Sequence, residues 1–284
     1  MIHKLLSSEE MLVKMKAQVL LSGIVLIMVI VLPECVSAHD PVFGLGPHTL
    51  YKGGVELHAG GHNEKSGNAS EKEAELQFKY GLTGDWVIGV GVPYEFGDDE
   101  GSHRGSTSLS TKYRFWRQDG FAVQESMALM GKVIFGDVEN HGDVERDGND
   151  YLLGIAYGYE GRKWYRWVSV RHRFNAPTTT GLTRPDARLV DIVGGIRFSP
   201  TEYYEPDWVW MLELNGELIE NISRGVGSAE RRVGGNQWFL SPGLMWTYRN
   251  FALKAGVQLP VIDDLSADQV QDDYRAKVEL EWHL

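Results

Sequence analysis

Cysteine is almost absent from this chain of 284 residues, which has a single one, Cys35. One cysteine excludes a disulfide scaffold, a cysteine-based zinc module and most iron–sulfur sites. Basic residues are also few, since 28 Lys and Arg stand against 39 Asp and Glu and leave a formal net charge of −11. That balance argues against a nucleic-acid-binding protein, whose footprint would be a basic face. The 43% hydrophobic content is too high for a disordered chain.

Long hydrophobic runs are missing from the chain after residue 38, so no later segment is predicted to be a membrane-spanning helix. An apolar run does occur nearer the start of the chain, at 20–32, but it is about 13 residues long, which is short for a membrane-spanning helix. Lys14 and Lys16 precede this run and Val36-Ser37-Ala38 follows it. A basic start, an apolar middle and a small-residue cleavage site predict a secretory signal peptide over 1–38, cleaved after Ala38.

Two alternatives for the start of the chain stay open at this stage. The apolar run can serve as an uncleaved anchor, or Cys35 can mark a lipoprotein signal, although Glu34 is not the small residue expected before a lipidated cysteine. Met15 would begin a signal peptide of more ordinary length than Met1.

Apolar and polar residues alternate along most of the remaining chain. The stretches 74–82, 86–96 and 274–284 show this alternation over their whole length. A period of two predicts strands with one apolar and one polar face. We predict twelve strands, at 50–60, 71–82, 85–96, 106–117, 121–135, 150–160, 163–174, 188–198, 207–220, 236–248, 251–261 and 273–284.

The order of the links and the positions of the aromatic residues decide what kind of sheet these strands form. Links alternate between short turns such as 83–84 and long polar loops such as 61–70 and 221–235. Aromatic residues stand at both ends of several apolar sets, as Trp86 and Phe96 do. Both features are typical of outer-membrane barrels. The sequence therefore predicts an all-β chain: a transmembrane, antiparallel, up-and-down β-barrel.

We expect the barrel to occupy residues 49–284 and a short periplasmic segment to occupy 39–48. A secreted β-sandwich is the alternative, because its strands alternate too. Strand 163–174 fits the pattern least well, since Tyr165 and Trp167 share a face with Arg171. The apolar register of the last strand, 273–284, predicts recognition by the machinery that inserts barrels into the outer membrane of Gram-negative bacteria.

Charged residues of both signs fall on the polar face of the strands, which would line the lumen. The candidates for a solute pathway are Glu73, Glu75, Lys79, Lys112, Arg114, Lys132, Arg171, Arg173, Glu213, Glu217, Lys254, Arg275, Lys277 and Glu279. A barrel of this size is too wide for side chains to fill, which favours a water-filled or partly plugged pathway for a small solute. A salt-bridged interior that conducts nothing is the alternative.

Histidines are concentrated at the predicted start of the processed chain, at His39, His48, His58 and His62. These four are candidate metal ligands, because imidazole nitrogens bind zinc and copper. Cleavage after Ala38 would place the amine and imidazole of His39 together as a copper chelate. Their spacing does not define a metal site, and polar histidines near a barrel rim are the alternative.

Other partners follow from composition. The acidic loops around 98–100, 137–150 and 263–273 predict solvated surfaces and, as a further option, bridging by divalent ions to lipopolysaccharide. Membrane lipid is the expected surrounding. No nucleic-acid partner and no cofactor are predicted. No G-x-S-x-G motif occurs, so no enzymatic activity is predicted.

The last fifty residues carry two motifs in a fixed order. Gly234-Gly235-Asn236-Gln237-Trp238-Phe239-Leu240-Ser241-Pro242-Gly243-Leu244 precedes Ala255-Gly256-Val257-Gln258-Leu259-Pro260-Val261, and the last strand opens with Asp273-Tyr274-Arg275. The region 234–284 resembles the bacterial outer-membrane family labelled "meta-pathway of phenol degradation", whose members are described as transporters. The resemblance implies an outer-membrane barrel and suggests transport, without establishing phenol as the cargo.

Two functions are therefore expected. The first is a channel or transporter for small solutes, aromatic or hydrophobic compounds among them. The second is a closed structural or surface-binding barrel, linked to metal handling through its histidine-rich start.

Overall fold

The computed structural model describes residues 39–96, 102–136, 147–179, 181–201, 204–226, 229–266 and 269–284. The predicted signal peptide, 1–38, lies outside these residues. None of the described residues belongs to a helix with the length and hydropathy that crossing a membrane requires.

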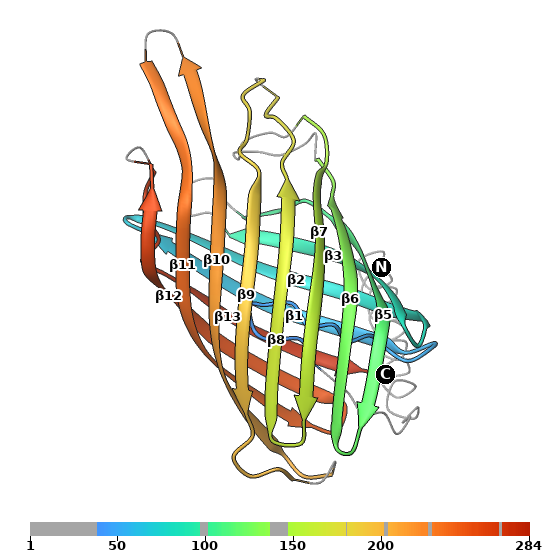
Figure 1. Cartoon of the computed structure of the whole chain (residues 1–284). Helices are drawn as coiled ribbons and strands as arrows, with labels where there is room; N and C mark the ends of the chain where they lie inside the picture. The colour runs from blue at the N-terminus through green and yellow to red at the C-terminus, as the bar shows by residue number, and fades with distance from the viewer. Residues whose placement is uncertain are drawn as a thin grey trace, which may run out of the picture. The chain divides into compact units, whose positions relative to one another are not determined.

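Thirteen antiparallel strands in the described part of the chain form one sheet, shown in Figure 1. They are β1 Val55–Ser66, β2 Ala69–Thr83, β3 Trp86–Phe96, β4 Ser102–Arg104, β5 Ser108–Gly120, β6 Val123–Ile134, β7 Asp150–Gly161, β8 Trp164–Phe174, β9 Ala187–Ile196, β10 Asp207–Val226, β11 Ala229–Tyr248, β12 Phe251–Leu265 and β13 Tyr274–His283. Strands that follow one another in sequence pair, except that β5 pairs with β3 rather than with β4, and β1 also pairs with β13.

These pairings close the sheet into a barrel. The short strand β4 pairs only with the end of β3, so the other twelve strands make the wall. A closed wall has no edge, so its backbone amides and carbonyls find partners within the sheet. Lipid cannot supply hydrogen bonds, and a closed barrel is one of the two backbone arrangements that can cross it.

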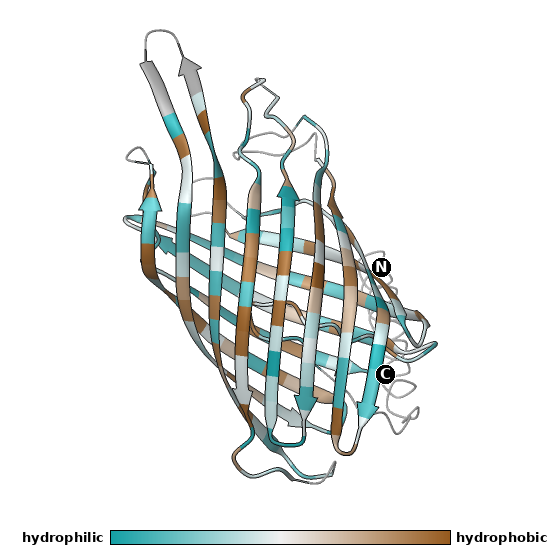
Figure 2. Cartoon of the chain, in the orientation of Figure 1, coloured by the Kyte–Doolittle hydropathy of each residue, from teal (hydrophilic) through white to brown (hydrophobic). Residues whose placement is uncertain are grey.

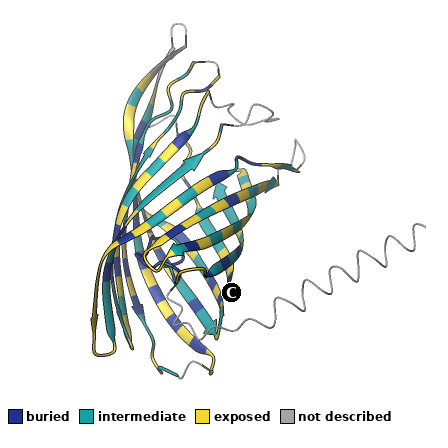
Figure 3. Ribbon diagram, turned by 90° about the vertical axis from the view of Figure 1, so that its right-hand side faces the viewer, coloured by how far each residue is buried: buried dark blue, intermediate teal, exposed yellow. Residues whose placement is uncertain are grey.

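The apolar face of each strand points outward. On β7, Tyr151, Leu153 and Ile155 are exposed on the outer surface, while Ala156 is buried on the inner one. Figures 2 and 3 show the same alternation of hydropathy and burial along the other strands. A water-soluble β-sandwich would bury these side chains, so the outward apolar belt supports a barrel that spans a membrane.

Aromatic side chains form part of a girdle at the end of the barrel where the short turns lie. Trp208 pairs with Trp246 across β10 and β11, with ring centroids 6.4 Å apart. The rings of Phe251 and Trp282 stack at 5.6 Å across β12 and β13. Such girdles mark the level of the membrane–water interface.

The structure corrects the extent of several predicted strands. The predicted loop 61–70 is mostly strand, because β1 and β2 pair as far as Ser66 and Ala69. The predicted loop 221–235 is likewise mostly strand, in the long β10–β11 hairpin. Above the membrane both faces of a strand meet water, so the alternation that marks a strand in the sequence is lost there.

The β8 strand resolves the ambiguity of the predicted strand 163–174. Its pairings with β7 and β9 run in register without a bulge. Trp167 and Arg171 face the lumen together, while Arg166 points outward and lies over the ring of Tyr159, 5.3 Å from its centroid. The lumen face of β8 therefore carries both an aromatic and a charged residue, and the contacts of Trp167 inside the barrel explain why.

A charge on the outer face tests the orientation of the wall. We expect Ile155→Arg, in the middle of β7, to destabilise the barrel by about 2–4 kcal/mol, because arginine near the bilayer midplane is costly. The control Tyr151→Arg, at the end of the same strand, should cost about 0–1 kcal/mol, because arginine there reaches the interface. Unfolding by denaturant in phospholipid vesicles measures both, and equal small costs would contradict the outward register.

Candidate functional site

Residues 39–50, named here the inner segment, lie inside the ring of strands. His39, Val42, Leu45 and His48 are all buried although they belong to no strand. The thin blue trace that crosses the barrel in Figure 1 is this part of the chain. Residues 39–48, predicted to form a short periplasmic segment, have partners on the inner wall for both their backbone and their side chains.

The backbone of the inner segment is held by one carboxylate. Glu213, on β10, is fully buried and accepts hydrogen bonds from three successive amides. The amide of Val42 donates to Oε1 at 2.8 Å, that of Phe43 to Oε1 at 3.3 Å, and that of Gly44 to Oε2 at 2.8 Å. Three hydrogen bonds from successive amides to one side chain make Glu213 the main polar anchor of the segment.

An apolar cluster on the wall receives the side chain of Val42. The buried members of this cluster are Val42, Trp167, Val193, Val209, Met211 and Met245. Phe43 and Tyr165 pack against it. This contact explains why β8 presents a tryptophan to an otherwise polar lumen, since Trp167 covers the inner segment.

Glycines on the wall make room for the inner segment. A Cβ atom on Gly243 would lie 2.9 Å from Cγ2 of Val42, and one on Gly256 would lie 2.8 Å from Cε2 of Phe43. Both glycines belong to the two motifs on which the family resemblance depends. Their place in the structure gives those motifs a physical meaning, because each allows the inner segment to approach the wall closely.

Lysines complete the attachment. Nζ of Lys112, on β5, lies 2.9 Å from each carboxylate oxygen of Asp40. Lys277, on β13, donates to the carbonyl of Val42 at 3.0 Å, and Lys254, on β12, donates to the carbonyl of Asp40 at 3.3 Å. The lumen lysines thus bind backbone and side-chain oxygens of the inner segment.

The rest of the wall is cross-linked by polar contacts. Asp191 accepts hydrogen bonds from Arg171 at 2.6 Å and from Asn215 at 2.9 Å. Arg275 pairs with Glu217 at 2.7 Å and with Asp272 at 2.6 Å. The first pair joins the neighbouring strands β8 and β9, whereas Arg275 and Glu217 join β13 to β10, so opposite charges compensate one another both along and across the lumen.

The described residues line two cavities in the lumen beside the inner segment. The first has a volume of about 190 Å³, lies toward the short-turn end, and its lining includes Lys79, Lys112 and Lys132. The second has a volume of about 240 Å³ and is lined by Glu73, Glu75, Lys277 and Glu279 among others. Gln77, on β2, lines both, so the cavities follow one another along that strand.

The predicted pathway residues thus divide into four groups. Seven line the cavities: Lys79, Lys112, Lys132, Glu73, Glu75, Lys277 and Glu279. Glu213 and Lys254 hold the inner segment, while Arg171, Glu217 and Arg275 form ion pairs within the wall. Arg114 instead pairs with Asp85 at a short turn, and Arg173 shares the lumen face of β8 with Arg171.

The four predicted histidine ligands do not meet in one place. His48 forms an ion pair with Glu160 at 2.7 Å, and His62 lies 3.7 Å from Glu64 in the second cavity. His58 lies between Glu56 and Glu279, and His39 contacts Glu281. The sequence analysis missed His283, which approaches His39; its alternation with Glu281 on the polar face of β13 was the available signal.

The acidic loops are described only in part. The cluster 98–100 and most of 137–150 lie outside the described residues, so the predicted contacts with lipopolysaccharide stay predictions.

A closed, membrane-spanning β-barrel with a polar lumen and an N-terminal segment inside it is the class of protein that this geometry defines. No family model matches the chain, so the resemblance seen in 234–284 stays an expectation. No curated protein matches it either.

Solved structures show the same fold. An outer-membrane channel from Pseudomonas putida F1 is 12% identical, with a TM-score of 0.56, and the match covers 87% of this chain and 100% of that one. The NanC porin is 8% identical, with a TM-score of 0.51, and the match covers 80% of this chain and 100% of that one. At these identities the likeness concerns the fold alone.

Replacing Gly243, a glycine of the first motif, with a larger residue tests how closely the inner segment packs against the wall. We expect Gly243→Val to weaken docking by about 1–3 kcal/mol, because the new side chain overlaps Val42 in a packed cluster. Faster proteolysis of residues 39–50 in the folded barrel would report this. The control Gly194→Val, whose Cβ would meet open space, should leave the rate unchanged. Equal rates for both variants and wild type would contradict the packing.

The ion pair of His48 predicts a dependence on pH. Burial lowers the pKa of His48, but the nearby carboxylate of Glu160 outweighs this and raises the pKa above its usual 6.5. Such a shift stabilises docking fully below about pH 6.5, and the stabilisation is lost as the pH rises through the raised pKa. Asp40 adds to the rise and Lys112 opposes it.

We therefore expect proteolysis of the inner segment to accelerate as the pH rises above about 6.5 and through the raised pKa of His48, where that side chain loses its proton. Glu160→Gln should flatten this dependence, because the pKa of His48 would fall back. A pH profile that is identical in the variant and the wild type would show that another group is responsible.

Proposed function

We propose that this protein is an outer-membrane channel for small solutes, in which the inner segment narrows the lumen. The observation that carries the proposal is the succession of two polar cavities along β2, inside a barrel whose outer face is apolar. A barrel built only to be closed gains nothing from such spaces, whereas a pathway requires them.

The outer membrane is the proposed location. The lipid-facing belt and the likeness in fold to an outer-membrane channel and a porin support it. Export by the predicted signal peptide, insertion through the last strand, and contact with lipid and lipopolysaccharide belong to the same proposal.

The first cavity suggests the size and chemistry of the solute. Its lining combines the apolar side chains of Leu45, Leu50 and Val87 with the ammonium groups of Lys112 and Lys132. A volume near 190 Å³ is of the order of the space that holds one benzene-sized ring, about 150 Å³. Because Asp40 and Glu56 also line this cavity, a small amphipathic molecule with one ring and a hydrogen-bonding group fits this description.

The inner segment sets the width of the pathway. Its attachments combine the three bonds to Glu213 with the apolar seat of Val42. Larger solutes would pass only when this segment shifts, so the proposed channel has a narrow resting state. The extensive ion pairing of the wall favours the alternative of a closed structural barrel, and conductance separates the two.

Releasing the inner segment tests the channel. In planar bilayers we expect small conductance steps from the wild type and steps at least about twofold larger from Glu213→Ala, because the lumen widens when the segment detaches. Glu217→Ala removes another lumen carboxylate, one that pairs with Arg275 rather than the segment, and should behave as the wild type does.

Selectivity supplies a second readout of the same experiment. Lys132→Glu changes the charge of the cavity lining and should shift the reversal potential toward cations, whereas Arg117→Glu, exposed at the barrel end, should not. Silence of both wild type and Glu213→Ala over a wide voltage range would overturn the channel and favour the closed barrel.

A further inference from the structure

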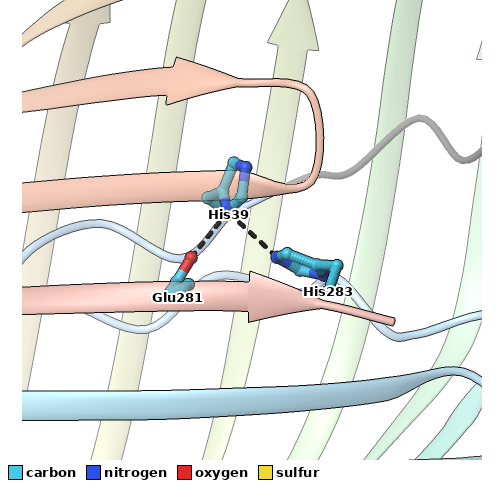
Figure 4. Close-up of side chains that lie close together, drawn as sticks. All are labelled: His39, Glu281 and His283. Carbon is cyan, nitrogen blue, oxygen red and sulfur yellow. Dashed lines mark hydrogen bonds and ion pairs between the residues drawn. The ribbon is translucent and has the colours of Figure 1, made fainter. Parts of the chain in front are cut away.

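Three buried side chains meet where the inner segment begins and the last strand ends. His39 comes from the inner segment, while Glu281 and His283 come from the lumen face of β13 (Figure 4). One donor atom from each residue lies within 4.8 Å of the other two. Two imidazoles and a carboxylate form a donor set that first-row transition metals bind.

We propose that His39, Glu281 and His283 bind a divalent transition-metal ion, with Cu²⁺ the preferred one. Nδ1 of His39 lies 2.6 Å from Oε2 of Glu281 and 3.4 Å from Nε2 of His283. Ligand atoms that share an ion at about 2.0–2.2 Å lie roughly 2.8–3.6 Å from one another. The two pairs that include His39 lie close to this spacing, and the donors of Glu281 and His283 lie within 4.8 Å of each other, so shifts of these side chains would admit an ion.

The nitrogen that His39 presents is the one that favours copper. Nδ1, rather than Nε2, approaches Glu281 and His283. In a histidine with a free amine, Nδ1 and the amine nitrogen close a six-membered chelate ring on the same ion. Cleavage after Ala38, as the sequence predicts, creates this amine and completes a set of three nitrogens and one oxygen. Nitrogen-rich sets bind Cu²⁺ most tightly among the divalent first-row ions.

Neighbouring residues orient two of the three ligands. Oε2 of Glu56 lies 3.2 Å from Nδ1 of His283, so a proton on Nδ1 leaves the lone pair of Nε2 directed at the site. A carboxylate behind a histidine is the usual support of metal-ligating imidazoles. Lys254 binds Oε1 of Glu281 and leaves Oε2 to face His39.

A second cluster nearby, Glu56, His58 and Glu281, is a weaker candidate for the ion. Nζ of Lys79 lies 2.9 Å from both Oε1 of Glu56 and Nε2 of His58, so an ammonium ion already occupies the position that a cation would take. The site at His39 has its lysine behind the carboxylate instead, on the side away from the histidines.

The inferred site is independent of conduction through the barrel. A bound ion would join the start of the inner segment to the last strand of the wall, whether or not a solute passes. Binding is therefore measured directly, and failure of the channel proposal would leave this inference standing.

Copper titration of the full processed protein tests the site. The protein is purified in detergent from outer membranes, stripped with a chelator, and its N-terminus determined by mass spectrometry. We expect one Cu²⁺ per chain by calorimetry and an electron paramagnetic resonance spectrum with nitrogen hyperfine structure. His283→Ala and His39→Ala should each weaken binding by about a hundredfold, and Glu56→Gln by roughly tenfold.

His62→Ala is the matched control, because His62 lies on the lumen face of β1 outside the cluster and should bind copper as the wild type does. A heat-modifiable shift on gels shows that each variant still forms a barrel. Absence of stoichiometric copper in the wild type, or equal affinity in His283→Ala, would overturn the site.

An added residue isolates the role of the amine. A variant processed to leave one extra alanine before His39 keeps every side chain but removes the chelate ring. We expect it to lose at least about tenfold in copper affinity and to change the nitrogen hyperfine pattern. An unchanged affinity, or a native N-terminus other than His39, would overturn the chelate.

Discussion

The need to compensate charge inside a membrane-spanning barrel governs this structure. Lipid on the outside forces the apolar residues outward, and the polar residues that alternate with them must then meet inside. Glu213 shows the consequence most clearly: this fully buried side chain finds most of its hydrogen-bond donors in the backbone of the inner segment, and Asn215 of the wall adds a longer one. The backbone amides of the inner segment thus supply the hydrogen bonds that this buried side chain of the lumen requires.

The same constraint explains why the wall is uneven. On the β8–β11 side an apolar seat with Trp167 and Met211 replaces the ionic lining, because there the segment's own apolar side chains need cover. On the β2–β6 side the segment is held through the ion pair of Asp40 with Lys112, and the cavity near Lys132 remains beside it. The inner segment thus divides the lumen into a packed half beside β8 to β11 and a half that contains the cavity.

The sequence was sufficient for the barrel itself. The period of two, the aromatic ends and the alternation of short and long links depend only on the local chain and on the solvent that each face meets, so the strand number and the inward residues followed from them. The boundaries outside the membrane did not follow, because the strand ends there lose the alternation, as the last five residues of β1 show by being all partly buried.

The candidate site was predictable only in part. The inward register of Glu281 and Lys254 could be read from β12 and β13. The docking of 39–50 could not, because it depends on contacts between residues far apart in sequence, such as Val42 with Glu213 and Gly243. A histidine-rich start suggested metal chemistry, but the partner His283 lies 244 positions away along the chain.

The long reach of the inner segment also constrains how the protein assembles. Its seat is built from strands β8 to β11, and further contacts come from β12 and β13, all of which follow it in the chain. Residues 39–50 therefore lack their full set of contacts until the last strands of the barrel have paired. Contacts so distant in sequence form slowly. The wall of the barrel therefore closes around residues 39–50, and the docking of this segment and the closure of the barrel take place together.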